Sequence, residues 1–217
     1  MKIKHVIFDW DGTLADTYPV ITKAYSAIFE HLNLNPLSYQ EIKELTSRLP
    51  NKDTLGFLFG KRKEEAKKVY YDYIKNHHTD DLNPIPYAKD LLDYCRDSEY
   101  KTYLLTNKQR PYLLPELEKL GFVNCFTKII AAGDLPEDKP SQTAVFALFD
   151  NNLPSPNSVL VIGDGYADWQ VACTLSTEKQ KALCALYNPQ QDFKDAKPDY
   201  LISDWRDLIN ILKKERA

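Results

Sequence analysis

Several features that mark particular protein classes are missing from this chain of 217 residues. It has no Cys-x-x-Cys pair and no histidine cluster with zinc-ligand spacing. The adjacent His77 and His78 would point in different directions on a helix and could not share a metal ion, so we expect both at the surface. We therefore expect no zinc site, and buried free thiols at all four cysteines, which are Cys95, Cys125, Cys173 and Cys184.

Long apolar runs and an excess of positive charge are also absent. No run approaches the roughly 20 residues that span a bilayer, and the apolar start of the chain meets Asp9 before it could form a signal peptide. The formal net charge of −3 offers no basic field that attracts nucleic acid. We expect a cytoplasmic protein, a monomer or homodimer, with no membrane or nucleic-acid partner.

What the chain does contain, downstream of residue 85, is an alternation of strand-like and helical stretches. Such an alternation is typical of an α/β fold with a parallel sheet and crossover helices. The predicted strands are 102–105, 128–130, 159–162, 182–186 and 200–202, and the predicted helices are 87–97, 112–120, 141–150, 166–175 and a last one that carries Trp205, Leu208, Ile209 and Leu212.

The interval between the first strand, at His5 to Phe8, and the next one is too long for a single crossover. It is about three times the roughly 30 residues of a complete βαβ unit. Apolar residues recur in it with helical spacing, first from Val20 to Ile28 and again from Ala66 to Ile74. We therefore predict an α/β core of residues 1–15 and 84–217, with a helical cap of residues 16–83 inserted at the mouth of the site. The proline-rich stretch 83–86 is the stiff, extended return linker.

Two carboxylates, Asp9 and Asp11, stand one residue apart at the end of the first apolar strand, and Gly12 follows them directly. In open α/β sheets the carboxyl ends of the strands border the ligand crevice. The pair is therefore a candidate for a nucleophile, an acid or a metal ligand.

Three later strand ends carry the residue types that two carboxylates near a phosphate require. Thr106 and Asn107 offer a hydroxyl and a backbone N–H, Lys139 an ammonium, and Asp164 and Asp168 two further carboxylates. Each alone has a structural explanation, as a helix cap, a surface lysine, a turn or an acid at a helix N-terminus. Their succession at four strand ends in one chain favours a shared site.

In these motifs, Asp9-x-Asp11-Gly12-Thr13, Thr106-Asn107, Lys139-Pro140 and Gly163-Asp164 with Asp168, the chain resembles the haloacid dehalogenase superfamily. The resemblance spans nearly the whole chain and implies a Rossmann-like, doubly wound sheet with a helical cap of the first type. The stretch 104–108, which ends in Lys108, looks most like the phosphoglycolate phosphatase branch.

The resemblance, together with the chemistry of the residues, implies a magnesium-dependent phosphatase. Asp9 attacks the phosphorus to form an aspartyl-phosphate, and Asp11 acts as acid in the first step and base in the second. Thr106, Asn107 and Lys139 stabilise the transferred group. The expected Mg²⁺ ligands are carboxylate oxygens of Asp9 and Asp164, the backbone carbonyl of Asp11, and Asp168, either directly or through a water.

The substrate stays open. We expect a small phosphorylated metabolite, phosphoglycolate-like or a sugar phosphate. Arg48, in the break between two cap helices at 46–52, is the candidate specificity residue, because a guanidinium pairs with a carboxylate or phosphate through two hydrogen bonds; the alternative is a plain surface arginine. The alternatives are a β-phosphoglucomutase-like phosphomutase, a phosphonatase with Lys43 or Lys52 as Schiff-base lysine, and a binding module without turnover. The intact Asp11 disfavours a hydrolytic dehalogenase.

Three positions depart from the family pattern. Gly165 replaces a hydroxyl residue after Asp164, the stretch 187–189 replaces a glycine-rich turn, and Tyr87 stands where a glycine is usual. The changes at 187–189 and Tyr87 weaken the assignment of any one named substrate. Gly165 removes a hydroxyl near the metal but no carboxylate, so metal binding is expected to survive that change.

Overall fold

The structure is a computed structural model that describes residues 3–48, 51–187 and 196–216. Its contacts divide the chain into two compact units. The larger consists of Met1–Asp16 with Pro84–Ala217, and the smaller of Thr17–Asn83.

The larger unit is built on a sheet of six parallel strands in the order β5-β4-β1-β6-β7-β8. From β1 the chain first adds β4 and β5 on one side and then β6, β7 and β8 on the other, so the expected doubly wound topology is confirmed. The strands are β1 (His5–Phe8), β4 (Lys101–Gln109), β5 (Lys128–Ala132), β6 (Val159–Gly163), β7 (Leu183–Tyr187) and β8 (Tyr200–Ile202).

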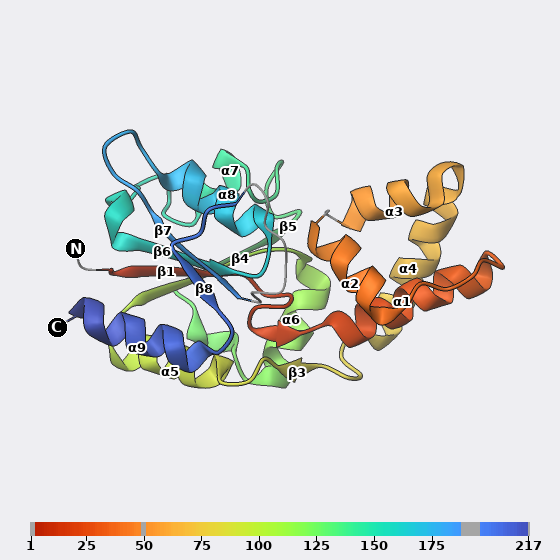
Figure 1. Ribbon diagram of the computed structural model, residues 1–217, viewed down its shortest axis with the longest axis horizontal. Helices are drawn as coiled ribbons and strands as arrows, with labels where there is room; N and C mark the ends of the chain where they lie inside the picture. The colour runs from red at the N-terminus through yellow and green to blue at the C-terminus, as the bar shows by residue number, and fades with distance from the viewer. Residues whose placement is uncertain (1–2, 49–50, 188–195, 217) are drawn as a thin grey trace. The chain divides into compact units, whose positions relative to one another are not determined.

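Helices cover both faces of this sheet (Figure 1). On one face α7 (Gln142–Ala147) and α8 (Tyr166–Leu175) pack on the side chains of Ile7, Val161 and Cys184. The other face carries α5 (Ala88–Asp97), α6 (Arg110–Leu120) and α9 (Trp205–Arg216). Because both faces are buried, the central strands are continuous apolar runs, as β6 shows with five buried residues in succession.

Two element ends differ most from the prediction. The helix expected over 141–150 stops at Ala147, since Asp150 and Asn151 take left-handed backbone angles, φ 50° and 61°, that end a right-handed helix. Strand β4, expected to end near Thr106, continues to Gln109 with a shift of register after Leu105. In this irregular stretch the Thr106 hydroxyl accepts a hydrogen bond from the backbone N–H of Lys108 at 3.1 Å.

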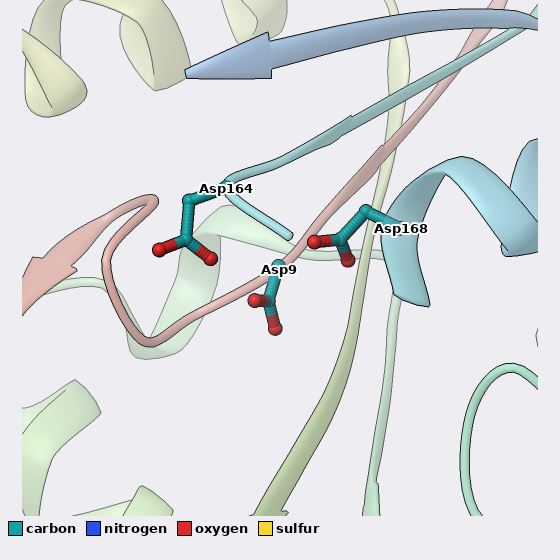
Figure 2. A group of neighbouring side chains, drawn as sticks. All are labelled: Asp9, Asp164 and Asp168. Carbon is teal, nitrogen blue, oxygen red and sulfur yellow. The ribbon is translucent and has the colours of Figure 1, made fainter. Parts of the chain in front are cut away.

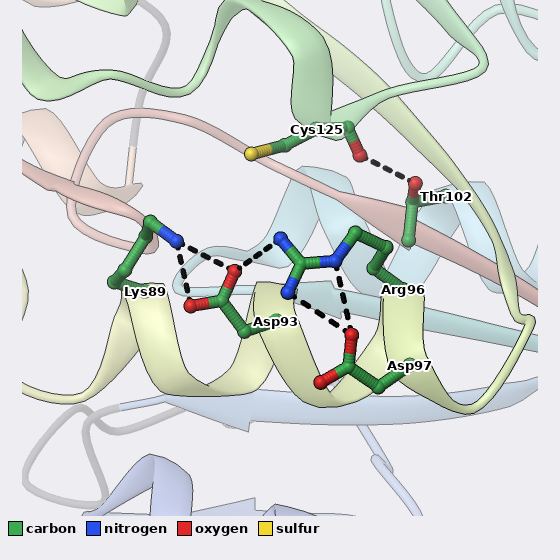
Figure 3. A network of polar contacts seen from close by, with 6 residues as sticks. All are labelled: Lys89, Asp93, Arg96, Asp97, Thr102 and Cys125. Atoms are coloured by element: carbon green, nitrogen blue, oxygen red, sulfur yellow. Dashed lines mark hydrogen bonds and ion pairs between the residues drawn. The ribbon is translucent and has the colours of Figure 1, made fainter.

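Helix α5 begins at Ala88 and buries Leu91, Leu92 and Cys95 against the sheet. Its outer face carries a chain of ion pairs (Figure 3), in which Lys89 and Arg96 both contact Asp93, at 2.5 and 2.8 Å. Arg96 also contacts Asp97 at 3.0 Å. Lys89, Arg96 and Asp97 are exposed and Asp93 is half-buried, so these pairs contribute little to stability.

The smaller unit contains the helices α1 (Tyr18–His31), α2 (Tyr39–Arg48), α3 (Asn51–Phe59) and α4 (Lys63–His77). The two apolar stripes seen in the sequence face inward, since Ala24 and Ile28 of α1 and Ala66 and Ile74 of α4 are buried. The rings of Tyr25 and Tyr70 meet edge to face, with 5.5 Å between their centroids.

A two-stranded sheet of β2 (Ala15–Asp16) and β3 (Asn83–Pro84) lies at the boundary of the two units along the chain. The backbone N–H of Ile85 donates to the carbonyl of Leu14 at 2.9 Å, which extends this pairing. The return segment is thus extended, as its prolines indicate.

All four cysteines are free thiols, but the expectation that all are buried is wrong. Cys95 and Cys184 are buried, Cys125 is half-buried, and Cys173 is exposed on α8, whose other side packs on the sheet. Among the described residues, no helix has the length and apolarity needed to cross a membrane.

Candidate active site

Two of the predicted acids follow neighbouring strands of the sheet. Asp9 comes after β1 and Asp164 after β6, and these strands pair in register, with Phe8 opposite Ile162. The backbone N–H of Asp9 donates to the carbonyl of Ile162 at 2.9 Å. The pairing therefore sets both carboxylates at the same edge, beside the point where the strand order reverses.

Asp168 joins them from the first turn of α8. One carboxylate oxygen from each of Asp9, Asp164 and Asp168 lies within 4.8 Å of the others, and all three residues are buried (Figure 2). Asp168 also accepts a hydrogen bond from the backbone N–H of Gly165 at 3.0 Å. It thus caps its own helix while it faces the other two acids.

Gly163 makes this approach possible. A Cβ atom at this position would lie 2.0 Å from Cγ of Asp168, far inside the contact limit. The last residue of β6 must therefore be a glycine for the third carboxylate to reach the other two. The sequence shows a glycine at position 163, but it does not show that the Asp168 carboxylate packs against it.

Lys139 lies between two of the acids. Its Nζ atom is 2.5 Å from Oδ1 of Asp9 and 2.8 Å from Oδ1 of Asp168, and the side chain is only 5% exposed. Burial lowers the pKa of Lys139, but the carboxylates of Asp168 and Asp9 outweigh it and raise the pKa above its ordinary value. Lys139 is therefore a fixed cation beside the Asp9 carboxylate.

Burial raises the pKa of the Asp9 carboxyl to about 7, against the opposing effect of the Lys139 ammonium. The neighbouring Asp168 carboxylate adds to the rise. Three buried carboxylates this close together repel one another, so positive charge at the site is favourable.

The three acids have the chemistry that a hard divalent cation requires. Mg²⁺ takes oxygen ligands and is held in proteins by one or two carboxylates together with waters and substrate oxygens. The cluster of Asp9, Asp164 and Asp168 supplies three oxygen donors within 4.8 Å. The residues present therefore fit such an ion.

Asp11 lies apart from this cluster, in a tight turn after β1. The backbone N–H groups of Leu14 and Ala15 both donate to the carbonyl of Trp10, at 3.0 and 3.1 Å, and Gly12 takes a φ of 73°. The carboxylate of Asp11 is 31% exposed, and its Oδ1 accepts a hydrogen bond from Nζ of Lys108 at 2.9 Å. Asp11 is thus a separately held acid beside the three clustered ones.

Thr106 and Asn107 lie at the irregular end of β4. Thr106 is buried, while Asn107 is exposed and donates from Nδ2 to the backbone carbonyl of Lys139 at 3.1 Å. Its side chain thereby ties the lysine-bearing loop to β4. This is a contact that the sequence did not predict.

Other predicted positions lie wholly or partly outside what the structure describes. Arg48 is the last residue of α2, and its side chain, like those of Lys43 and Lys52, lies outside what the structure describes. Of the stretch 187–189, only Tyr187 is described, and its ring stacks on Trp205 with 4.5 Å between centroids.

The main feature that sequence reasoning missed is a buried partner of Lys108. Glu116 of α6 is fully buried, and its Oε1 lies 2.9 Å from Nζ of Lys108, while its Oε2 accepts from the indole N–H of Trp10 at 2.7 Å. One signal was present in the sequence. Glu116 falls on the apolar stripe of the predicted helix, between Leu113 and Leu117, where a charge needs a buried partner.

Known proteins resemble this chain over almost its full length. A phosphoglycolate phosphatase from Chromobacterium violaceum is 27% identical, over 98% of this chain and 99% of that protein. The pyrophosphatase PpaX from Oceanobacillus iheyensis is 25% identical, over 98% of each.

Solved structures share the fold. A haloacid dehalogenase-like family protein from Streptococcus pneumoniae matches with a TM-score of 0.81 at 20% identity, over 96% of this chain and 98% of that one. The family model of haloacid dehalogenase-like hydrolases matches residues 6–178, which is most of the chain. The chain therefore belongs to the haloacid dehalogenase-like hydrolase family.

Proposed function

We propose that this enzyme is a magnesium-dependent phosphatase that hydrolyses a small phosphorylated metabolite through an aspartyl-phosphate on Asp9. The observation that carries the proposal is the buried Asp9 carboxylate, paired with Lys139 and clustered with Asp164 and Asp168. The phosphatase names of the full-length relatives support the same reaction class.

In the first step an oxygen of Asp9 forms a bond to phosphorus while the bond from phosphorus to the leaving oxygen breaks. Asp11 gives its proton to that oxygen. In the second step Asp11 takes a proton from water, whose oxygen attacks the phosphorus and releases Asp9. Two accessible steps replace one difficult step.

The remaining residues stabilise the transferred group. Lys139 and the hydroxyl and backbone N–H groups at Thr106 and Asn107 offset its negative charge, which otherwise repels the anionic nucleophile. Asp9, Asp164, Asp168 and the carbonyl of Asp11 would hold Mg²⁺. The ion, when bound, supplies further positive charge against the phosphoryl oxygens.

We further propose that residues 16–83 act as a helical cap on the core of residues 1–15 and 84–217. A cap at the site excludes water and selects the substrate, and Arg48 is the candidate for that selection, because a guanidinium binds a carboxylate or phosphate with two hydrogen bonds. The candidate substrates are phosphoglycolate-like compounds and sugar phosphates.

The test is a panel of phosphorylated metabolites and 4-nitrophenyl phosphate, assayed with Mg²⁺ and with EDTA. We expect phosphate release with Mg²⁺, its loss with EDTA, and a loss of at least about 10³-fold in Asp9→Asn, because a carboxamide is a poor nucleophile. Equal turnover by Asp9→Asn would mean that the nucleophile is another residue.

The same panel separates hydrolysis from phosphoryl transfer within one sugar phosphate. A solved structure from Thermotoga maritima, described as a candidate β-phosphoglucomutase, shares the fold with a TM-score of 0.74. Interconversion of sugar phosphates with little free phosphate would replace the phosphatase proposal by a phosphomutase.

A further inference from the structure

A buried polar chain beside the candidate site has no part in the steps above. It runs from Trp10 to Glu116, to Lys108 and to Asp11, with distances of 2.7, 2.9 and 2.9 Å between successive partners. It joins three elements of the larger unit, which are the turn after β1, the end of β4, and α6. This series of polar contacts ends at Asp11, the residue to which we assign proton transfer.

Glu116 occupies a costly position. Its side chain is 0% exposed, and a buried carboxylate is stable only where its oxygens find donors. Lys108 approaches one oxygen and Trp10 the other. Burial raises the pKa of Glu116, and the Lys108 ammonium opposes this rise.

Lys108 is equally confined, since its side chain is 10% exposed. Burial lowers its pKa, but the carboxylates of Asp11 and Glu116 together raise it above the ordinary value. A lysine side chain is flexible and could otherwise reach for a substrate phosphate. The contact with Glu116 holds it on the Asp11 side.

We propose that Lys108 and Glu116 are positioning residues for Asp11. Lys108 holds Oδ1 of Asp11, which leaves Oδ2 to deliver the proton to the leaving oxygen and to receive one from water. Glu116 fixes Lys108 and balances its charge. This role rests on the proposed function and assigns no new reaction.

The role predicts a dependence on the leaving group. A good leaving group departs as an anion without help, whereas a poor one needs the proton from Asp11 in the transition state. Loss of the positioning pair therefore slows substrates with poor leaving groups and spares those with good ones. A residue that binds phosphate, or only supports the fold, affects all of them equally.

The experiment measures kcat/KM for phenyl, 4-nitrophenyl and 2,4-dinitrophenyl phosphate, which differ mainly in their leaving group. In Lys108→Met we expect a loss of about 10²-fold on phenyl phosphate and under about 3-fold on the dinitrophenyl ester. Glu116→Gln is expected to show a smaller loss of the same kind, because glutamine keeps an acceptor for Lys108. Glu118→Gln, exposed on the same helix, is the matched control without effect.

Because Lys108→Met leaves Glu116 buried without its cation, that variant can fail to fold. The double variant Lys108→Met/Glu116→Gln removes both charges, and its thermal midpoint establishes whether it is folded. We expect it to show the same dependence on the leaving group as Lys108→Met.

Three results are informative against the proposal. An equal loss on all three esters, with KM unchanged, would make the pair structural only. A rise in KM on all three would make Lys108 a phosphate ligand. If the unmodified enzyme releases no phosphate from any ester, the proposed function itself fails, and the positioning role fails with it.

Discussion

Gly163, the last residue of β6, leaves room for the carboxylate of Asp168. We predict that Gly163→Ala lowers phosphatase activity by at least about 10²-fold, because a Cβ 2.0 Å from Cγ of Asp168 displaces that carboxylate or the strand end. It is also expected to destabilise the fold by about 1 to 3 kcal/mol through overpacking. Activity assays and urea denaturation measure the two effects.

Gly56→Ala provides the matched control. This glycine lies inside α3, and an added Cβ would meet its nearest neighbour, Cδ of Lys63, at an ordinary 3.6 Å. Alanine there is expected to leave activity unchanged and to stabilise α3 slightly. Full activity in Gly163→Ala would contradict the close packing of Asp168 against β6.

For single residues, the sequence predicted the convergence of those that stand at strand ends or in the loops after them. Asp9, Asp164 and Lys139 converge because parallel strands and the loops after them meet at one edge of the sheet. Glu116 could not be assigned in the same way, since its partners Trp10 and Lys108 come from other elements and only tertiary packing brings them together.

Among the elements, α5 has an unusual beginning. Tyr87, its N-cap, takes left-handed angles, φ 64° and ψ 9°, and the guanidinium carbon of Arg206 lies 4.0 Å from the centroid of its ring. Left-handed angles cost a residue with a side chain roughly 1 kcal/mol, and the cation–π contact with Arg206 opposes that cost. The contact therefore offsets the absence of a glycine.

We accordingly predict that Tyr87→Ala is less stable than the unmodified protein, because it keeps the backbone strain and loses the contact with Arg206. Tyr87→Gly is expected to be more stable than Tyr87→Ala by about 1 kcal/mol. Midpoints of urea denaturation give both differences. Equal stability of the two variants would show that the left-handed angles carry no cost here.

Element boundaries show where local patterns suffice. The strands β1 and β6 were predicted closely because short apolar runs buried on both faces have a clear signature. The end of β4 was not predicted, because the strand continues past Leu105 in an irregular form with a shift of register. In this stretch the backbone N–H of Lys108 donates to the Thr106 hydroxyl. Helix α7 ends early because the backbone of Asp150 takes left-handed angles. An aspartate can adopt these angles, but its presence in the sequence does not predict them.

For the whole molecule, the clustered acids link stability to metal binding. An ion that binds only the folded state stabilises it by about 2.7 kcal/mol at a hundred times its Kd. We predict that saturating Mg²⁺ raises the apparent thermal midpoint by on the order of 5 to 10 °C, compared with NaCl of equal ionic strength.

The control for that shift is Asp164→Asn, which removes one of the three oxygen anions and is expected to lose most of the response. Differential scanning calorimetry or fluorescence measures both proteins. An equal rise in the variant would indicate that the ion binds elsewhere.

The pairing of β2 with β3 has a consequence for how such a chain can change. Because Ala15–Asp16 and Asn83–Pro84 lie side by side, the polypeptide departs from the larger unit and re-enters it at a single place. The register of the six parallel strands therefore does not depend on the length of the segment that connects β2 to β3. Helical segments of other sizes can be exchanged there while the acids at the ends of β1 and β6 keep their spacing.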